Sequence, residues 1–359
     1  MERIILTEFN PTRGHSVLLA NTCRLLSVKY DVTPVVTQDN TRLGTNNCVQ
    51  LPFCYYKSKR NPFIDFVSFV LYTIKIISAI FKVANRKGID TIVCITYDEV
   101  SLFLLTPFIS RKFNIYLMSH VNIDNYEKSR IKRWMFNKFK NRYSHIVQCG
   151  FLAEHLKKDY QLNNILVWPH PLNNLACSDT VRNVDCAGLS FSNDEEIIKS
   201  FMEAEIKNSV FKNHNLRVIL KSQIYNYDNG YLTIIKGALP NKDYDDIINR
   251  AKSILMPFPL SFQYRMSGTL IDSLTNNKIV YSTPIRIIEE SRKAYPNVIR
   301  VFNKESFISD LCSNMGGGSN ERDFVNFLDF HCDENLSKIM CDGLKASMCG
   351  DLVINQYDF

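Results

Sequence analysis

One stretch in the second half of the chain combines residue types that bind phosphate groups. Tyr264 and Arg265 are followed by Ser267, Gly268 and Thr269, where an apolar pattern with helical spacing begins. The first turn of a helix offers free backbone N–H groups and the positive end of the helix dipole, and both favour an anion. Together with the adjacent arginine, this turn predicts a binding site for a diphosphate. The alternative is an ordinary strand-to-helix loop with a solvated arginine.

The elements around this loop form a strand-loop-helix-strand unit. Ser253 to Phe258 is a short apolar run closed by prolines, which predicts a buried strand that ends in a turn. The apolar residues beyond the loop predict a short helix, and Lys278 to Ser282 predicts the next strand. Upstream, Asp243 to Arg250 predicts a helix with acidic residues in its first turn, and Leu216 to Leu220 predicts a buried strand that ends at Lys221.

The first half of the chain shows the same alternation of strands and helices. Two parallel strands are predicted over Arg3 to Phe9 and Asp31 to Thr37, joined by a helix over Val17 to Leu26. Gly14 and His15 lie at the first strand-to-helix turn, where open α/β sheets bind ligands. This turn lacks the GxGxxG pattern, which argues against a nicotinamide dinucleotide. The alternative for His15 is a loop histidine in water.

Later parts of the sequence predict further candidate site residues and a boundary between domains. Asn114 to Ser119 predicts a strand, which delivers His120 and Asp124 at its carboxyl end. The proline-rich step Pro169-His-Pro171 predicts a hinge, because residues before proline are extended. A closing helix is predicted over Asp333 to Met348.

The order of elements in the second half resembles the donor half of GT-B glycosyltransferases. The pattern includes the Gly237-Ala-Leu-Pro240 step, a helix, the LMPF strand, the Ser267-Gly268 turn and a strand that ends near Pro284. It is closest to bacterial enzymes related to glycosyltransferase family 4, which build surface polysaccharides such as O-antigen and capsule. The resemblance covers most of the chain at the level of pattern.

This resemblance implies an α/β fold with two Rossmann-like domains that face a cleft. Residues 1–172 would form the acceptor-binding domain and residues 173–332 the nucleotide-sugar-binding domain. Residues 333–359 would form a helix and tail that return to the first domain.

The resemblance also assigns roles to individual residues. Lys221 and Arg265 would neutralise the donor diphosphate without a metal or other cofactor. His15, His120 and Asp124 would be the candidates for a catalytic base, and Gly14 would lie in a loop facing the sugar.

The chain departs from the family pattern at one point. Family members carry a glutamate three residues before the loop glycine and a second one in the following helix. Here Arg265 takes the first place, and Asp272 is the nearest acid to the second. Asp272 is in register to accept hydrogen bonds from a ribose, although a solvated helix carboxylate is equally ordinary. The departure leaves the donor and the stereochemical outcome open.

We therefore expect a glycosyltransferase that moves a sugar from a nucleotide diphosphate to a saccharide, which the resemblance suggests is lipid-linked. A nucleotide-sugar epimerase or hydrolase of the same fold is the alternative, and so is a non-catalytic binding protein. Composition agrees with a globular enzyme, since 45% of the 359 residues are hydrophobic and 22% are charged. The 11 scattered cysteines favour free thiols, and Met1 runs straight into a predicted strand, so we expect a cytoplasmic protein.

Two segments could meet a membrane surface. Pro62 to Val83 is strongly apolar but carries Asp65, Lys75 and Lys82, which favours a helix packed on the sheet or lying in an interface over a spanning one. Glu127 to Tyr143 predicts a helix rich in cations and aromatic residues. Its interpretations are a solvated face, then binding to anionic lipid at the inner face of the membrane, then nucleic-acid binding, which no accompanying motif supports.

Overall fold

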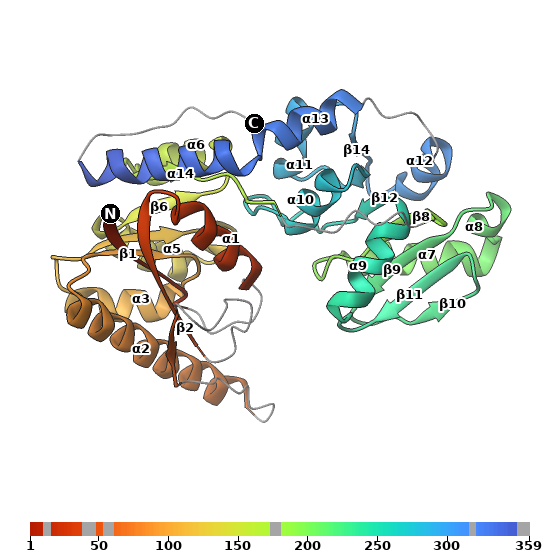
Figure 1. Ribbon diagram of the computed structural model, residues 1–359. Coiled ribbons are helices and arrows are strands. Elements are labelled where there is room, and N and C mark those ends of the chain that lie inside the picture. Colours follow the sequence, from red (N-terminus) through yellow and green to blue (C-terminus); the bar gives the residue numbers. More distant parts are fainter. Residues whose placement is uncertain (10–15, 38–47, 53–60, 173–180, 316–320, 350–359) are drawn as a thin grey trace. The chain divides into compact units, whose positions relative to one another are not determined.

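The computed structural model describes residues 1–9, 16–37, 48–52, 61–172, 181–315 and 321–349 (Figure 1). The chain folds as two compact units. Unit 1 comprises Met1–Pro171 together with His331–Phe359, and unit 2 comprises Leu172–Phe330. Each unit is a twisted, mainly parallel sheet with helices packed on it, as the alternating sequence pattern predicts.

The sheet of unit 1 has seven parallel strands in the order β3-β2-β1-β4-β5-β6-β7. The strands are β1 (Glu2–Thr7), β2 (Tyr30–Thr37), β3 (Val49–Leu51), β4 (Thr91–Cys94), β5 (Asn114–Met118), β6 (Ser144–Val147) and β7 (Ile165–Val167). The helices are α1 (Ser16–Leu26), α2 (Pro62–Lys87), α3 (Glu99–Leu105), α4 (Asn122–Lys128), α5 (Arg130–Phe139), α6 (Gly150–Tyr160) and α14 (Asp333–Met348), with 3₁₀ turns η2 (Thr106–Phe108) and η3 (Lys140–Arg142).

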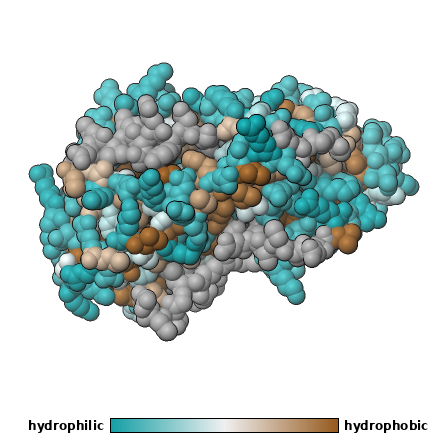
Figure 2. Space-filling view, turned by 45° about the horizontal axis from the view of Figure 1, so that its top comes forward, coloured by the Kyte–Doolittle hydropathy of each residue, from teal (hydrophilic) through white to brown (hydrophobic). Residues whose placement is uncertain are grey.

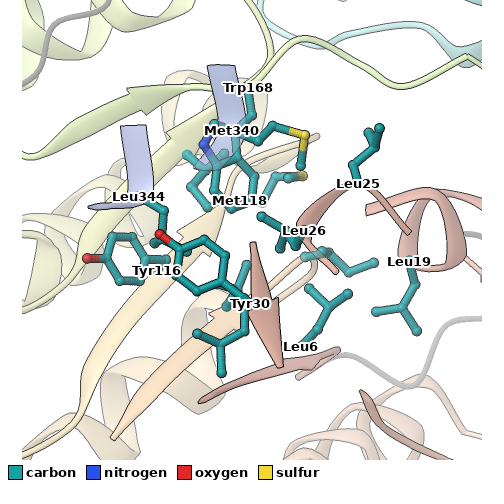
Figure 3. Packing of buried hydrophobic residues seen from close by; sticks show 14 of the residues in the cluster. Leu6, Leu19, Leu25, Leu26, Tyr30, Tyr116, Met118, Trp168, Met340 and Leu344 are labelled. Atoms are coloured by element: carbon teal, nitrogen blue, oxygen red, sulfur yellow. The ribbon is translucent and has the colours of Figure 1, made fainter. Parts of the chain in front are cut away.

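The last helix of the chain, α14, belongs to the core of unit 1. Leu336, Met340 and Leu344 from α14 pack with Leu6 of β1 and Trp168 beyond β7 in one buried cluster (Figure 3). Polar contacts fix the helix at this place. The Ser337 hydroxyl donates to the Leu25 carbonyl at 2.6 Å, and the Tyr30 hydroxyl donates to the Cys341 carbonyl at 3.1 Å. A segment distant in sequence thereby completes the first domain.

The sheet of unit 2 also has seven strands, in the order β10-β11-β9-β8-β12-β13-β14, and all pairs are parallel except β10 with β11. The strands are β8 (Val184–Gly188), β9 (Val218–Ser222), β10 (Tyr227–Asp228), β11 (Leu232–Lys236), β12 (Ala251–Met256), β13 (Ile279–Ser282) and β14 (Ile299–Val301). The helices are α7 (Glu195–Asn208), α8 (Val210–Asn213), α9 (Asn241–Arg250), α10 (Gly268–Thr275), α11 (Arg286–Ala294), α12 (Phe307–Asn314) and α13 (Glu321–Phe330). The strand order reverses between β8 and β12, which makes the carboxyl ends of these two strands the expected ligand-binding point.

Gly188 is the last residue of the central strand β8, and the packing around it leaves no room for a side chain. A Cβ atom at this position would lie 2.8 Å from Leu220 Cδ2 and 3.1 Å from the Leu255 carbonyl oxygen. Both distances are shorter than ordinary contacts. The neighbouring strands β9 and β12 can therefore approach β8 closely only with glycine here.

The structure corrects two predictions about elements. Lys221 does not follow its strand but lies within β9, because the pairing with β11 extends through Ser222. The basic segment 127–143 is also not one helix, because the Ser129 side chain caps a new helix, α5, within it.

Candidate functional site

Two helices begin at the carboxyl ends of the central strands of unit 2, and only one of them can accept an anion. Helix α7 follows β8, and its first turn carries Asp194 as cap together with Glu195 and Glu196. Lys304 already pairs with this cluster, at 3.5 Å from Asp194 and 2.5 Å from Glu196. Three carboxylates at this terminus would repel a phosphate.

Helix α10 follows β12 and has the opposite character. Its first turn carries no acidic residue. The Ser267 side chain caps the helix by accepting from the Leu270 N–H at 3.3 Å. The first N–H groups of the helix are therefore those of Gly268 and Thr269. A Cβ atom at Gly268 would have no described neighbour within 4 Å. The start of α10 therefore combines open space, small residues and the positive end of the helix dipole, as an anion site requires.

The loop between β12 and α10 is fixed by contacts to the next strand-helix turn. The Thr283 hydroxyl donates to the Phe258 carbonyl at 2.7 Å. Arg286, the first residue of α11, donates from its backbone N–H to Gln263 Oε1 at 3.1 Å and from its guanidinium to the Tyr264 hydroxyl at 3.3 Å. These bonds hold the loop in one conformation, so Tyr264 and Arg286 are placed together.

Arg265 lies in the same loop, three residues before Gly268. Its guanidinium stacks on the Phe262 ring, with Cζ 3.6 Å from the ring centroid. In general, an arginine can stack on an aromatic ring and also form bidentate hydrogen bonds to an oxyanion through the edge of its guanidinium. The loop residues from Phe262 to Thr269 are all half-buried, so they are partly accessible.

Lys221 supplies a further cation at the same edge of the sheet. Its ammonium lies 4.8 Å from the centroid of the Phe191 ring, and partial burial lowers its pKa. Among the residues that the structure describes, no carboxylate pairs with it. Strand β9 is two positions from β12, and this corresponds to roughly 10 Å between their axes.

The loop beyond β8 lies between these cations and is held by two polar side chains. Asn193 donates from Nδ2 to the Gly188 carbonyl at 2.8 Å and to the Lys221 carbonyl at 2.9 Å. Glu195 accepts from the Ser222 hydroxyl at 2.5 Å and from the Gln223 N–H at 2.7 Å. Glu195 of α7 therefore fixes the end of β9.

Asp272 has a different environment from the one its sequence position suggests. It lies on α10, is only 8% exposed, and accepts a hydrogen bond from the Tyr244 hydroxyl of α9 at 3.3 Å. Burial, and next the charge of Asp272, raise the pKa of Tyr244, so this phenol stays protonated as a donor. A ribose that contacts Asp272 would therefore also lie next to Tyr244.

The candidates in unit 1 that the structure describes lie beyond β5. His120 is half-buried, and its backbone N–H donates to Asn122 Oδ1 at 3.3 Å. Asn122 in turn donates to the Tyr97 carbonyl and to Glu99, so it ties the loops after β4 and β5 together. Asp124 is 1% exposed, which leaves its carboxylate no open face in this conformation. Gly14 and His15 lie outside the described residues.

Comparison with solved structures gives the fold. The model aligns with sucrose-phosphate synthase from Thermosynechococcus elongatus over 98% of this chain and 100% of that one, at a TM-score of 0.66 and 9% identity. The chain also aligns with a protein described as a UDP-N-acetylglucosamine 2-epimerase from Listeria monocytogenes, over 100% of this chain and 99% of that one, at a TM-score of 0.62 and 11% identity. It aligns with Arabidopsis thaliana UGT89C1 complexed with UDP over 97% of this chain and 100% of that one, at a TM-score of 0.61 and 12% identity.

The chain has the GT-B fold. No family model matches the sequence, and no curated protein does. Identities this low establish the GT-B architecture alone, so function has to be argued from the side chains. In the described part of the chain no group of three histidine, cysteine, aspartate or glutamate residues could hold a metal ion.

Sequence reasoning missed several residues at this edge of the unit 2 sheet. Arg286, Phe191, Asn193 and Tyr244 all contact the predicted site residues. One signal was available for Arg286, since it stands just beyond a predicted strand, at the same edge of a parallel sheet. No pattern in the sequence could pair Tyr244 with Asp272, because they come from different helices.

Proposed function

We propose that the protein is a glycosyltransferase that moves a sugar from a nucleoside diphosphate to a hydroxyl group of an acceptor. One observation carries this proposal. Helix α10 follows β12, at the point where the strand order of unit 2 reverses, and it begins with open space at Gly268. The loop before this helix carries Arg265, and Lys221 lies on β9, two strands from β12. This arrangement fits a diphosphate, and the GT-B fold includes a structure that holds UDP.

The leaving group determines what unit 2 must do. When the bond between the anomeric carbon and the phosphate oxygen breaks, its electron pair stays on the diphosphate, so negative charge increases there. Arg265, Lys221 and the N–H groups of Gly268 and Thr269 would stabilise this charge. Because they are fixed before the reaction, they need little reorganisation when the charge develops.

The attacking hydroxyl must lose a proton as its oxygen bonds to the anomeric carbon. In unit 1, His120 is the described candidate for this base, because it lies just beyond β5 and its loop is fixed by Asn122. The burial of Asp124 makes it the weaker candidate. His15 keeps its place as a candidate from the sequence.

We further propose that the acceptor is a saccharide, that it is lipid-linked, and that the product belongs to a bacterial surface polysaccharide. The support is the sequence resemblance to family 4 enzymes. The protein would act in the cytoplasm at the inner face of the membrane.

Epimerisation or hydrolysis of the nucleotide sugar is the second candidate, because one structural neighbour is described as an epimerase. Incubation with UDP-, GDP- and ADP-sugars, with and without lipid-linked saccharides, distinguishes the reactions by mass spectrometry. Transfer yields a glycosylated acceptor and free nucleoside diphosphate in equal amounts. An epimeric nucleotide sugar, or free sugar without acceptor, would establish the second candidate instead.

A further inference from the structure

The first half of helix α2 exposes an unusual run of large apolar side chains. Phe63 is 73% exposed, Ile64 57%, Phe66 48%, Val67 39% and Leu71 55%. The face of the molecule in Figure 2 is mostly hydrophilic, which is ordinary for a globular protein. Five such residues within three turns of one helix form a continuous apolar surface and indicate an interaction site.

The same solvent-facing stripe becomes cationic in the second half of the helix. Lys75, Lys82 and Arg86 are exposed and continue the stripe at helical spacing beyond Leu71. The helix contains a single acidic residue, Asp65, which is 9% exposed. The accessible stripe of α2 is therefore apolar at one end, basic at the other, and free of acidic side chains.

The opposite side of α2 is part of the core of unit 1. Buried positions recur along the whole helix, at Val70, Thr73, Ile76, Ile77, Ile80 and Ala84. Asn61 caps the helix start by accepting from the N–H groups of Phe63 and Ile64, so the first turn is well formed. By length and composition the helix could cross a membrane. Its buried side is already occupied by the protein, so only the outer stripe is available to a partner.

The basic helix α5, which the sequence offers as a membrane site, is less suited to that role. Lys132 pairs with Glu99 at 3.2 Å, Arg133 pairs with Glu127, and Lys140 donates to the Tyr160 carbonyl. These cations are therefore engaged within unit 1. Of the two segments that the sequence offers for membrane contact, α2 is therefore the better candidate.

We propose that the outer stripe of α2 docks on an anionic lipid surface. The helix would lie in the plane of the interface, with its apolar half among the acyl chains and its lysines at the headgroups. Charge distinguishes this partner from a second copy of the chain. A symmetric dimer would place the same stripe on both sides, where it offers cations and no acids, whereas anionic lipid supplies the missing charge. This inference goes beyond glycosyl transfer and does not depend on it.

Sedimentation with vesicles tests the proposal on the full-length protein. Vesicles of phosphatidylcholine alone are compared with vesicles that also contain phosphatidylglycerol. We expect the anionic vesicles to bind the protein, and added salt to weaken this binding. The triple variant Phe63→Ser, Phe66→Ser, Leu71→Ser should lower the partition coefficient roughly a hundredfold or more, because each side chain buries apolar surface on insertion.

Charge and control variants complete the test. Lys75→Gln with Lys82→Gln should reduce binding to anionic vesicles roughly 25-fold, about fivefold for each lysine at about 1 kcal/mol, and leave binding to neutral vesicles unchanged. Ile206→Ser with Val325→Ser removes equally exposed apolar residues from unit 2 and should leave both unchanged.

Equal binding by wild type and the triple variant would overturn the proposal, as would binding to neither kind of vesicle. Self-association of the wild type that the triple variant abolishes, without vesicle binding, would assign the stripe to a second copy instead. Circular dichroism and melting temperature of each variant show that folding is retained, since these side chains are exposed.

Discussion

A methyl group at position 268 should block the diphosphate without disturbing the fold. Gly268 is the first residue of α10, and a Cβ atom there would meet no described atom within 4 Å. Because side chains in a helix tilt toward its N-terminus, the added carbon would project into the space where a phosphate oxygen must lie to accept from the first N–H groups. Gly268→Ala therefore perturbs the ligand and not the protein.

The size of the effect follows from the hydrogen bonds at stake. A hydrogen bond to a charged group contributes about 1.5–3 kcal/mol, so displacement of one such bond raises the Kd roughly 10- to 150-fold. Stability should stay constant or rise slightly, because alanine is favoured over glycine in helices by at most about 1 kcal/mol.

Isothermal titration calorimetry with UDP, GDP and ADP measures the affinity, and urea unfolding of the same samples measures stability. The reasoning predicts a large loss of affinity together with unchanged unfolding. Wild-type affinity in Gly268→Ala would refute the placement of the diphosphate at α10. Loss of both affinity and stability would mean that the Cβ does meet the protein, and would contradict the open space at this position.

Other residues give complementary predictions. Gly188→Ala should lower the free energy of unfolding by about 1–3 kcal/mol in urea denaturation, because its Cβ would lie 2.8 Å from Leu220 Cδ2. Arg265→Ala should raise the Kd for the nucleoside diphosphate about 10- to 100-fold by calorimetry, and normal binding would remove Arg265 from the site. Burial lowers the pKa of Lys221, and the ammonium is lost above its pKa, so affinity should fall as pH rises into the alkaline range earlier than for an ordinary lysine. Lys221→Arg should remove that fall, because arginine stays charged. His120→Gln should reduce turnover about 10²- to 10⁴-fold with nucleotide binding intact, and full turnover would exclude it as the base.

Much of the fold follows from local sequence patterns. Helix α14 (Asp333–Met348) begins and ends where the sequence pattern predicts. The strands before and after the β12–α10 loop also lie close to their predicted bounds, because buried parallel strands are short apolar runs with clear turn residues. The mainly parallel sheets follow from the repeated alternation of strand and helix.

What the sequence could not predict depends on tertiary contacts. The end of β9 lies one residue beyond Lys221 because β11 pairs with it, and this pairing leaves no local signal. The break at Ser129 depends on a cap, and a pattern of cations and aromatics conceals it. The ion pair between Lys132 and Glu99 joins two helices, so no local pattern predicts it. The arrangement of Tyr264 with Arg286 likewise arises only when two strand-helix loops meet.

A thermal-shift panel of nucleoside diphosphates and nucleotide sugars tests the central claim most directly. At a hundredfold excess over its Kd, a ligand stabilises the folded state by about 2.7 kcal/mol, which should raise the melting temperature by several degrees. We expect one nucleoside diphosphate and its sugar conjugates to produce this shift in the wild type and in His120→Gln, and to produce little or none in Gly268→Ala or Arg265→Ala. A flat response of the wild type to every nucleotide would contradict the assignment of a diphosphate site to unit 2, and with it the proposed transfer reaction.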